Sequence, residues 1–372
     1  MDILRAFAVL TVVYSHGLKF IYDRGLAWYY SALAFDGVSI FFVLSGFLIG
    51  GILLRIVNQP MVSARDIADF WIRRWFRTLP NYYLVLCFLL LTSATASALT
   101  LREVVQFFTF TQNIASPHPA FFPEAWSLAA EEWFYLTLPV ALFVLVRLFA
   151  NGRAKLILSF ILVALLGVTV LRAYEAGSIA DVQTWDMSLR KVVIYRLDAL
   201  MFGVLGACLK FYWIKGFFWK PRIMLCLGIG ILLFDRTQYF SLNQLEYLKY
   251  ASLTLTPLGT LLLLPYLVQM KGGSGWTFKF VTLISAISYS MYLLNLSPVL
   301  HVVLPKLLVA LSVPNDWTPA WALVRYSLFW CTTIVLSILL HYLYEKPMTG
   351  LRDRISKPEA AGKATPPAVV TM

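Results

Sequence analysis

The sequence is poor in charge: Asp, Glu, Lys and Arg together fill only 13% of its 372 positions. A typical water-exposed protein has roughly 25% charged residues, so a soluble enzyme and a disordered chain are both excluded. Acidic residues are the scarcer kind, with 19 against 31 basic residues and a formal net charge of +12. In a chain that is 60% apolar, this surplus is typical of cytoplasmic loops between membrane spans. The composition therefore predicts a polytopic membrane protein in a lipid bilayer, with no nucleic-acid partner.

Cysteine and metal-binding motifs are equally scarce. The four cysteines lie in apolar runs without C-x-x-C spacing, which excludes a disulfide scaffold and predicts reduced packing residues. The four histidines have no metal-ligand spacing, and neither a P-loop nor a dinucleotide-binding fingerprint occurs. We therefore expect no metal. No motif specifies an oligomeric state.

Long apolar runs dominate the chain instead. A bilayer core takes about 20 helical residues to cross, and this length identifies ten candidate spans: 3–22, 33–54, 79–99, 126–148, 156–174, 191–212, 222–235, 250–269, 281–304 and 321–343. The first span lacks a small-residue cleavage site, so we expect it to be retained rather than removed as a signal peptide. The sequence predicts an all-α membrane domain over residues 1–350.

Orientation follows from the basic residues. If both termini lie inside, most of the basic residues fall in cytoplasmic segments. Because basic residues gather on the cytoplasmic side of a membrane protein, the sequence predicts N-in and C-in. Residues 351–372 are rich in Pro and Ala and have few large apolar side chains. We expect them to form a disordered cytoplasmic tail.

Ionisable residues inside a span are costly, which makes each one a candidate for function. Arg5 and His16 lie eleven positions apart in the first span, so they share a helix face with about 16 Å between them along the axis. An arginine at the inner end can hold a phosphate, and a histidine deeper in the membrane can accept and return a proton. The alternative is an orienting arginine and a histidine bonded to a neighbouring helix.

A basic and aromatic cluster, WIRRWFRTLPNYY, precedes the third span. Arg73, Arg74 and Arg77 alternate there with Trp and Phe, which favours either a simple positive-inside loop with an aromatic belt or a mouth that binds phosphate and purine. In the second span, Ser45-Gly46 and Gly50-Gly51 form a small-residue face that favours close helix packing.

Three later segments also carry polar residues into spans. WSLAAEEWFYLTLP places Glu131 and Glu132 near Trp126, which favours helix N-terminal carboxylates or a site that handles sugars or protons. YRLDALMFG places Arg196 and Asp198 in the sixth span, where we expect them to pair with each other or with another helix. ISYSMYLLNL gives the ninth span one polar side, formed by Ser288, Tyr289, Ser290, Tyr292 and Asn295.

The order of these motifs is more specific than any one of them. DILRAFA followed by His16, then FFVLSGFLI, RRWFRTLP, WSLAAEEWFYL, YRLDALMFG, ISYSMYL and YEKP, resembles the integral-membrane acyltransferase-3 family over residues 1–350. The Arg-x10-His pair is the most diagnostic part. The resemblance implies transfer of a short acyl group, commonly acetyl, from cytoplasmic acyl-CoA (acetyl-CoA) to a hydroxyl of a glycan or other acceptor. It also implies a location in the bacterial inner membrane.

From the resemblance and the candidate residues together, we expect the following roles. His16 would act as the general base, although acylation of His16 itself is an open alternative. Asn295 stands where members often have histidine, so we expect position 295 to lie outside the chemistry. Glu131 or Asp198 would support catalysis by orienting or charge-balancing the imidazole. The CoA phosphates would be bound by Arg5, Arg73, Arg74 and Arg77. The acceptor would be bound by Trp126, Arg196 and Tyr289.

A transporter or flippase of a lipid-linked or sugar substrate is the rival class. Its buried charges would relay protons across the membrane. The absence of an inverted repeat and the arginines gathered at one end of the spans favour the acyltransferase.

Overall fold

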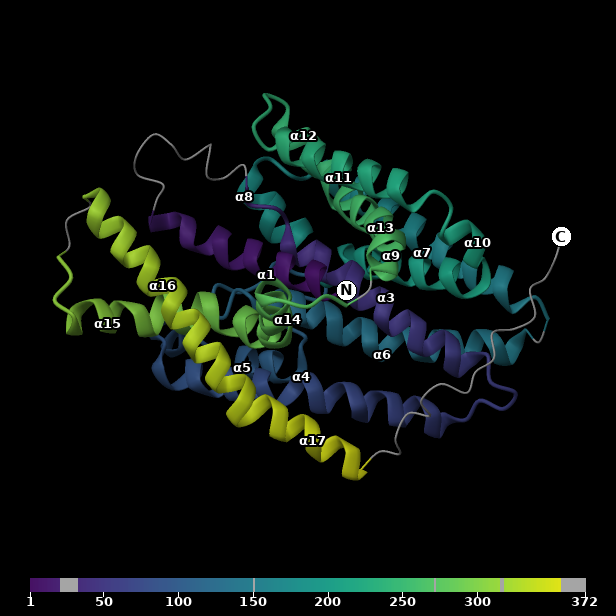
Figure 1. The fold of residues 1–372 in the computed structure, drawn as a ribbon, viewed down its shortest axis with the longest axis horizontal. Coiled ribbons are helices and arrows are strands. Elements are labelled where there is room, and N and C mark those ends of the chain that lie inside the picture. The colour runs from purple at the N-terminus through teal and green to yellow at the C-terminus, as the bar shows by residue number, and fades with distance from the viewer. Residues whose placement is uncertain (21–32, 150, 271, 315–317, 356–372) are drawn as a thin grey trace.

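The computed structural model describes residues 1–20, 33–149, 151–270, 272–314 and 318–355 (Figure 1). Within these ranges all regular elements are helices, which confirms the predicted all-α fold. Seven helical stretches are long and apolar enough to cross a membrane: Asp2–Phe20, Gly37–Val57, Ala125–Leu148, Arg153–Ala176, Gln244–Gln269, Trp276–Ala310 and Pro319–Leu351. The chain is therefore a polytopic membrane protein, while the count of ten spans and the N-in orientation stay predictions.

The other three expected spans are helices as well, namely α4 (Ala64–Thr92), α9 (Leu197–Tyr212) and α11 (Pro221–Gln238). The start of α4 corrects the sequence analysis, which placed the WIRRWFR segment in a loop before a span at 79–99. Ser63 and Asp66 form a capping box in which the Ser63 backbone N–H donates to the Asp66 carboxylate over 2.8 Å. This box starts the helix fifteen residues earlier, because it satisfies amide groups at the helix N-terminus.

The longer helices around α4 do not all run in the same direction (Figure 1). They are α1 (Asp2–Gly17), α3 (Gly37–Val57), α6 (Ala125–Leu148), α7 (Arg153–Ala176), α13 (Leu253–Gln269), α14 (Trp276–Leu294) and α16 (Pro319–Leu340). Shorter helices are α5 (Leu101–Thr109), α8 (Val182–Trp185), α10 (Ile214–Phe217), α12 (Gln244–Tyr247), α15 (Leu304–Ala310) and α17 (Lys346–Ile355). A π-helical segment, η7 (Asn295–Val303), joins α14 to α15.

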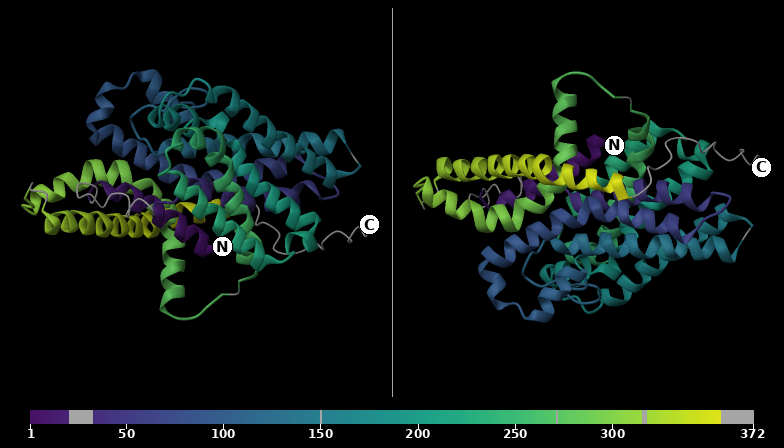
Figure 2. Two further views of the ribbon diagram at one scale, coloured as in Figure 1. Left: turned by 90° about the horizontal axis from the view of Figure 1, so that it is seen from above. Right: turned by 90° about the horizontal axis from the view of Figure 1, so that it is seen from below.

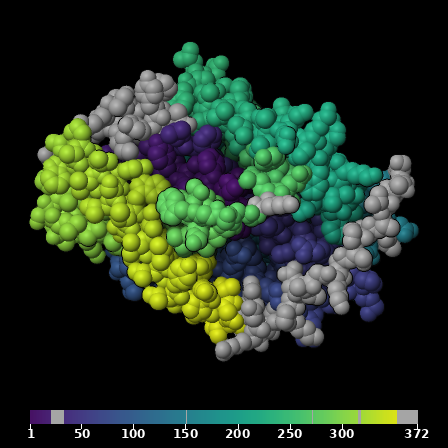
Figure 3. Space-filling view, viewed as in Figure 1, coloured from purple at the N-terminus to yellow at the C-terminus, as the bar shows by residue number. Residues whose placement is uncertain are grey.

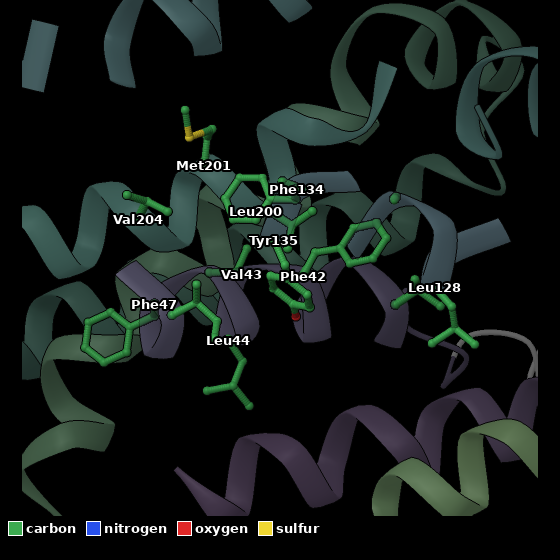
Figure 4. Packing of buried hydrophobic residues seen from close by; sticks show 14 of the residues in the cluster. Phe42, Val43, Leu44, Phe47, Leu128, Phe134, Tyr135, Leu200, Met201 and Val204 are labelled. Carbon is green, nitrogen blue, oxygen red and sulfur yellow. The ribbon is translucent and has the colours of Figure 1, made fainter. Parts of the chain in front are cut away.

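Helices α3, α6 and α9 form the main hydrophobic core (Figure 4). The closest approach is between α3 and α9, where a Cβ on Gly46 would lie only 1.9 Å from the Leu200 carbonyl oxygen. A Cβ on Gly203 would lie 2.1 Å from the Val43 carbonyl oxygen in the same way. These contacts confirm that the small-residue face of the second span serves helix packing.

Helix α1 packs between α3 and α14. In Figure 3 the light-green atoms of α14 stand in front of the purple atoms of α1. Both side views in Figure 2 show the start of α14 projecting from the rest of the bundle. At the other end of the chain, residue 350 lies inside α17, and residues 356–372 of the expected tail lie outside the described residues.

Candidate active site

A cavity of about 160 Å³ lies between α1, α3, α4, α6 and α14. Its polar wall is formed by Arg5, Ser45, Arg74, Arg77, Thr78, Ser127, Glu131, Ser288, Tyr289 and Tyr292. Its apolar wall is formed by Val38, Phe41, Phe42, Leu44, Leu48, Ile49, Ile52 and Leu128. Motifs from five separate parts of the chain therefore meet around one space.

Glu131 is the central carboxylate of this cavity. It accepts hydrogen bonds from the Ser45 hydroxyl at 3.1 Å and from the Tyr135 hydroxyl at 2.8 Å. Arg74 lies 3.5 Å from the same carboxylate, donates to the Tyr135 hydroxyl over 2.6 Å, and stacks 4.1 Å from that ring's centroid. Both charged side chains are 15% exposed. The arrangement brings an ion pair from α4 and α6 to the cavity wall.

The other predicted arginines take different positions. Arg5 lies at the start of α1, with Nη1 3.3 Å from the Ser285 hydroxyl and 3.4 Å from the Asp2 carboxylate. Arg77 lines the cavity and is exposed, whereas Arg73 is not among the lining residues. Two cationic groups besides Arg74 therefore face the cavity.

Tyr289, a predicted acceptor-binding residue, lies on the wall that α14 contributes. Its hydroxyl donates to the Thr78 carbonyl over 2.7 Å, which ties α14 to α4. The Thr78 hydroxyl in turn donates to Glu132 over 2.8 Å. Glu132 does not line the cavity, so the two adjacent glutamates have separate surroundings.

His16 lies near the end of α1, beyond the Tyr292 end of the cavity, and does not itself line it. Its Nδ1 is 2.5 Å from Oδ1 of Asn295, the first residue of η7. The Asn295 amide donates to the carbonyls of Met291 and Tyr292 over 2.9 and 2.8 Å. The imidazole is thus held by Asn295 and not by Glu131 or Asp198. From the sequence we expect position 295 to lie outside the chemistry, whereas the structure places Asn295 against His16.

Asp198 lies away from the cavity in an ion pair between α9 and α7. Its Oδ2 is 2.6 Å from Nη1 of Arg172, and both side chains are almost fully buried. Arg172 also donates to the Tyr195 carbonyl and to the Thr254 hydroxyl. The RLD motif therefore pairs with a neighbouring helix, one of the two arrangements that the sequence predicted.

Arg196 and Trp126, both predicted to bind the acceptor, are covered by other side chains. Arg196 is fully buried and donates to the Ser39 hydroxyl over 2.5 Å. Its guanidinium lies 5.7 Å from the Phe42 ring centroid and 6.0 Å from that of Trp126. Trp126 is 4% exposed and packs edge-on against Phe42. Neither residue lines the cavity, so Trp126 does not present an open ring to it.

An ionic cluster adjoins Trp126. Arg190 lies 5.3 Å from the Trp126 ring centroid and pairs with Asp36 and Asp186, and Lys191 also pairs with Asp186. Burial acts to raise the pKa of Asp186, but the charges of Arg190 and Lys191 outweigh it and hold the pKa below its usual value. The cluster therefore keeps its carboxylates ionised.

Glu124, which sequence reasoning missed, is a buried carboxylate beside the His16 region. It accepts from the Ser297 backbone N–H at 2.9 Å and from the Ser297 hydroxyl at 2.6 Å. Its carbonyl accepts from the Tyr292 hydroxyl over 3.1 Å. A glutamate just before the WSL motif resembles an ordinary residue preceding a helix, so only the contact with η7 reveals it.

A second cavity of about 400 Å³ has Ser297 in its wall. It is lined by Leu89, Thr92, Ser93, Ala94, Thr95, Ala120, Phe121, Phe122, Pro123, Ser297, His301, Val302, Pro305 and Lys306. The two cavities share no lining residue, and the segment from Tyr292 to Ser297 contributes to both. Across the residues that the model describes, no three or more His, Cys, Asp or Glu side chains gather as a metal site would require.

Comparison with protein families gives a match over most of the chain. The model described as "Acyltransferase domain" matches residues 1–343. The curated proteins that are similar over part of this chain include the following three. A peptidoglycan O-acetyltransferase of Listeria monocytogenes, OatA, is 30% identical over 57% of the chain and 33% of its own length. A putative peptidoglycan O-acetyltransferase of Bacillus subtilis, YrhL, is 33% identical over 48% of the chain and 28% of its own length.

An O-acetyltransferase of Staphylococcus aureus, OatA, is 26% identical over 57% of the chain and 34% of its own length. The matched segments thus span about a third of the length of these relatives. No solved structure matches the chain significantly.

Proposed function

The chain belongs to the integral-membrane acyltransferase-3 family, and we propose that it is a membrane O-acyltransferase. Its motifs predicted this family, and the match over residues 1–343 confirms it. The proposed reaction moves a short acyl group, acetyl in the first place, from cytoplasmic acyl-CoA to a hydroxyl of a glycan. The proposed location is the bacterial inner membrane.

The observation that carries the proposal is the cavity with arginines on one wall and hydrocarbon on the other. Arg5 and Arg77 supply the cationic forks that phosphate oxygens prefer, and the apolar wall from α3 suits a pantetheine arm. Arg5 and His16 lie on one face of the same continuous helix, about 16 Å apart along its axis. An extended pantetheine arm is of comparable length, so phosphates held at Arg5 would bring the thioester toward His16.

The size of the cavity supports a small acyl group. A cavity of about 150 Å³ is large enough for a molecule such as benzene, and this one measures about 160 Å³. An acetyl group and the adjoining thioester fit that space. The volume therefore supports a short acyl group on the donor.

The reaction would proceed with His16 as general base. His16 takes the proton from the acceptor hydroxyl as its oxygen attacks the thioester carbonyl carbon. The new C–O bond forms, the C–S bond breaks, and the imidazolium returns the proton to the leaving CoA sulfur. Glu131 pairs with Arg74 and Asp2 with Arg5 at the cavity wall, and Arg77 adds a further positive charge for the donor. Acylation of His16 before transfer is the alternative order of steps.

The acceptor side rests on the relatives and on the second cavity. Two of the similar proteins are named for O-acetylation of peptidoglycan, which makes a hydroxyl of peptidoglycan or its precursor the first acceptor to test. The second cavity has hydroxyl side chains together with His301 and Lys306, and its lining residue Ser297 lies two positions after Asn295, the partner of His16. In the proposed reaction the acceptor enters through this cavity, and the donor enters at the Arg5 end of α1.

The test is release of free thiol from short acyl-CoA by purified protein in lipid. We expect thiol release that increases when a glycan acceptor is added, and acylated acceptor in equal amount. His16→Gln should lower the rate by about 10²–10⁴-fold, the range that general bases contribute. His118→Gln is the matched control, because His118 is also buried but bonds only its neighbour, the Pro119 carbonyl.

Two results would overturn the proposal. No thiol release with any short acyl-CoA, together with movement of a sugar or lipid-linked substrate across vesicles, would favour the transporter class. Equal use of acyl-CoA from both faces of oriented vesicles would contradict the cytoplasmic donor, since the arginines lie toward the end of α1 that is predicted to face inside.

A further inference from the structure

The hydrogen bonds of Asn295 determine which nitrogen of His16 carries the proton. We infer that Asn295 is a positioning residue that holds neutral His16 in the Nδ1–H tautomer, so that Nε2 is the atom that accepts the proton. The catalytic meaning of this inference rests on the proposed acyl transfer, but the tautomer itself does not.

The orientation of the Asn295 amide is the first step. Its nitrogen lies 2.9 Å from the Met291 carbonyl and 2.8 Å from the Tyr292 carbonyl, and both of these groups can only accept. Turning the amide over would place its oxygen against two carbonyl oxygens and leave the nitrogen facing His16. The amide nitrogen therefore belongs where it is, and Oδ1 faces the imidazole.

The state of the imidazole follows from that orientation. Amide Oδ1 has no proton to give, and it lies 2.5 Å from Nδ1 of His16. Nδ1 must then donate, and in neutral histidine only one ring nitrogen carries a proton. The lone pair is on Nε2, and this is the position at which either proton uptake or acylation would take place.

Asn295 is well placed to hold this state through a reaction cycle. It is fully buried, and its neighbour Ser297 is anchored by two hydrogen bonds to Glu124, which fixes the start of η7. When Nε2 takes a proton, the Nδ1–H bond to Asn295 needs no rearrangement. A neutral amide also leaves the imidazole less basic than a carboxylate partner would, which favours return of the proton to the leaving thiolate.

The first experiment observes the tautomer directly. Protein labelled with ¹⁵N-histidine is examined by NMR in lipid at mildly alkaline pH, and the His16 signals are assigned by their loss in His16→Gln. The ring nitrogens with and without a proton have well-separated shifts, and two-bond couplings to the ring protons identify each nitrogen. We expect Nδ1 to carry the proton in the wild type and the signal to move toward the Nε2–H tautomer in Asn295→Leu.

Asn58→Leu is the matched control. Asn58 also donates its amide to the carbonyl four residues earlier, that of Leu54, but its other partner is Tyr212. It should leave the His16 signals and the activity unchanged. A wild-type protein whose His16 is protonated at Nε2, or an Asn295→Leu variant with an unchanged tautomer, would overturn the inference.

The second experiment measures kinetics as a function of pH. Asn295→Leu should lower kcat at least 10-fold with the KM for acyl-CoA within about twofold, since the donor cavity is left intact. Asn295→Asp keeps an acceptor oxygen at Nδ1 and adds negative charge, which stabilises charged His16. Because charged His16 cannot accept a proton, the acid limb of the profile should move to higher pH, with activity recovered above it.

Different results would contradict the acyl-transfer function and the role of Asn295. If the protein transfers no acyl group, the proposed function is wrong while the ¹⁵N shifts still decide the tautomer. If transfer is active and Asn295→Leu retains wild-type kcat, Asn295 does not position the base. An unshifted acid limb in Asn295→Asp would likewise refute the contact with His16.

Discussion

Replacing Gly46 by alanine tests the packing that joins α3 to α9. A methyl group at this position would lie 1.9 Å from the Leu200 carbonyl oxygen, whereas real Cβ contacts are essentially never closer than 3.0 Å. The obstacle is backbone, which cannot swing aside as a side chain can. The two helices would have to separate by about 1 Å, and overpacking of this kind typically costs about 1–3 kcal/mol or more.

Three variants make the comparison quantitative. Gly203→Ala on the opposing helix should destabilise the protein similarly, since its methyl would lie 2.1 Å from the Val43 carbonyl oxygen. Gly51→Ala is the control, because nothing lies within 4 Å of the added atom. The double variant of Gly46 and Gly203 should cost less than the sum of the single variants, because one separation of the helices relieves both clashes.

The assay is denaturant unfolding of the purified protein in mild detergent, followed by size-exclusion chromatography of the surviving folded fraction. We expect Gly46→Ala to unfold at clearly lower denaturant than Gly51→Ala. Gly46→Ala should also lose activity, because a shift of α3 would displace the adjacent Ser45 hydroxyl, which donates to Glu131 on α6. Equal stability of the Gly46 and Gly51 variants would refute the close approach of α3 and α9.

Three further predictions concern charged groups. Glu131→Gln should lower kcat/KM about 10–100-fold in the thiol-release assay, as expected for losing a charged hydrogen-bond partner. Glu132→Gln should have a much smaller effect in the same assay, because the Glu132 carboxylate lies outside the cavity. Arg5→Lys should raise the KM for acyl-CoA more than it lowers kcat, since the charge is kept and the fork is lost. Arg172→Met should destabilise the protein by about 3–5 kcal/mol by leaving buried Asp198 unpaired, and adding Asp198→Leu should restore most of that loss in denaturant unfolding.

Much of the fold could be predicted from the sequence because membrane helices must be long, apolar and internally hydrogen-bonded. Each of the ten expected apolar segments contains a helix in the structure. The ends were less predictable. Hydropathy alone ends a span where charge begins, so it could not show that α4 continues through Arg73 and Arg74 back to Ala64.

The candidate site was predictable where one helix determined the geometry. Arg5 and His16 share a face because α1 is a regular helix from Asp2 to Gly17. The partners of Glu131 were not predictable, because they come from separate helices, Ser45 on α3 and Arg74 on α4. Periodicity describes which way a residue points along its own helix, but it does not say which helix lies opposite.

Asn295 shows the same limit most sharply. The family resemblance predicts that position 295, where asparagine stands in place of a common histidine, lies outside the chemistry. An asparagine indeed takes up no proton itself. The structure gives the residue another use: its oxygen accepts from His16 while its nitrogen is held by the Met291 and Tyr292 carbonyls. An amide suits that task because it cannot exchange protons with the base that it holds. The loss of a titratable side chain at one position therefore does not show that the position has lost its function, and only the geometry around His16 reveals what Asn295 does.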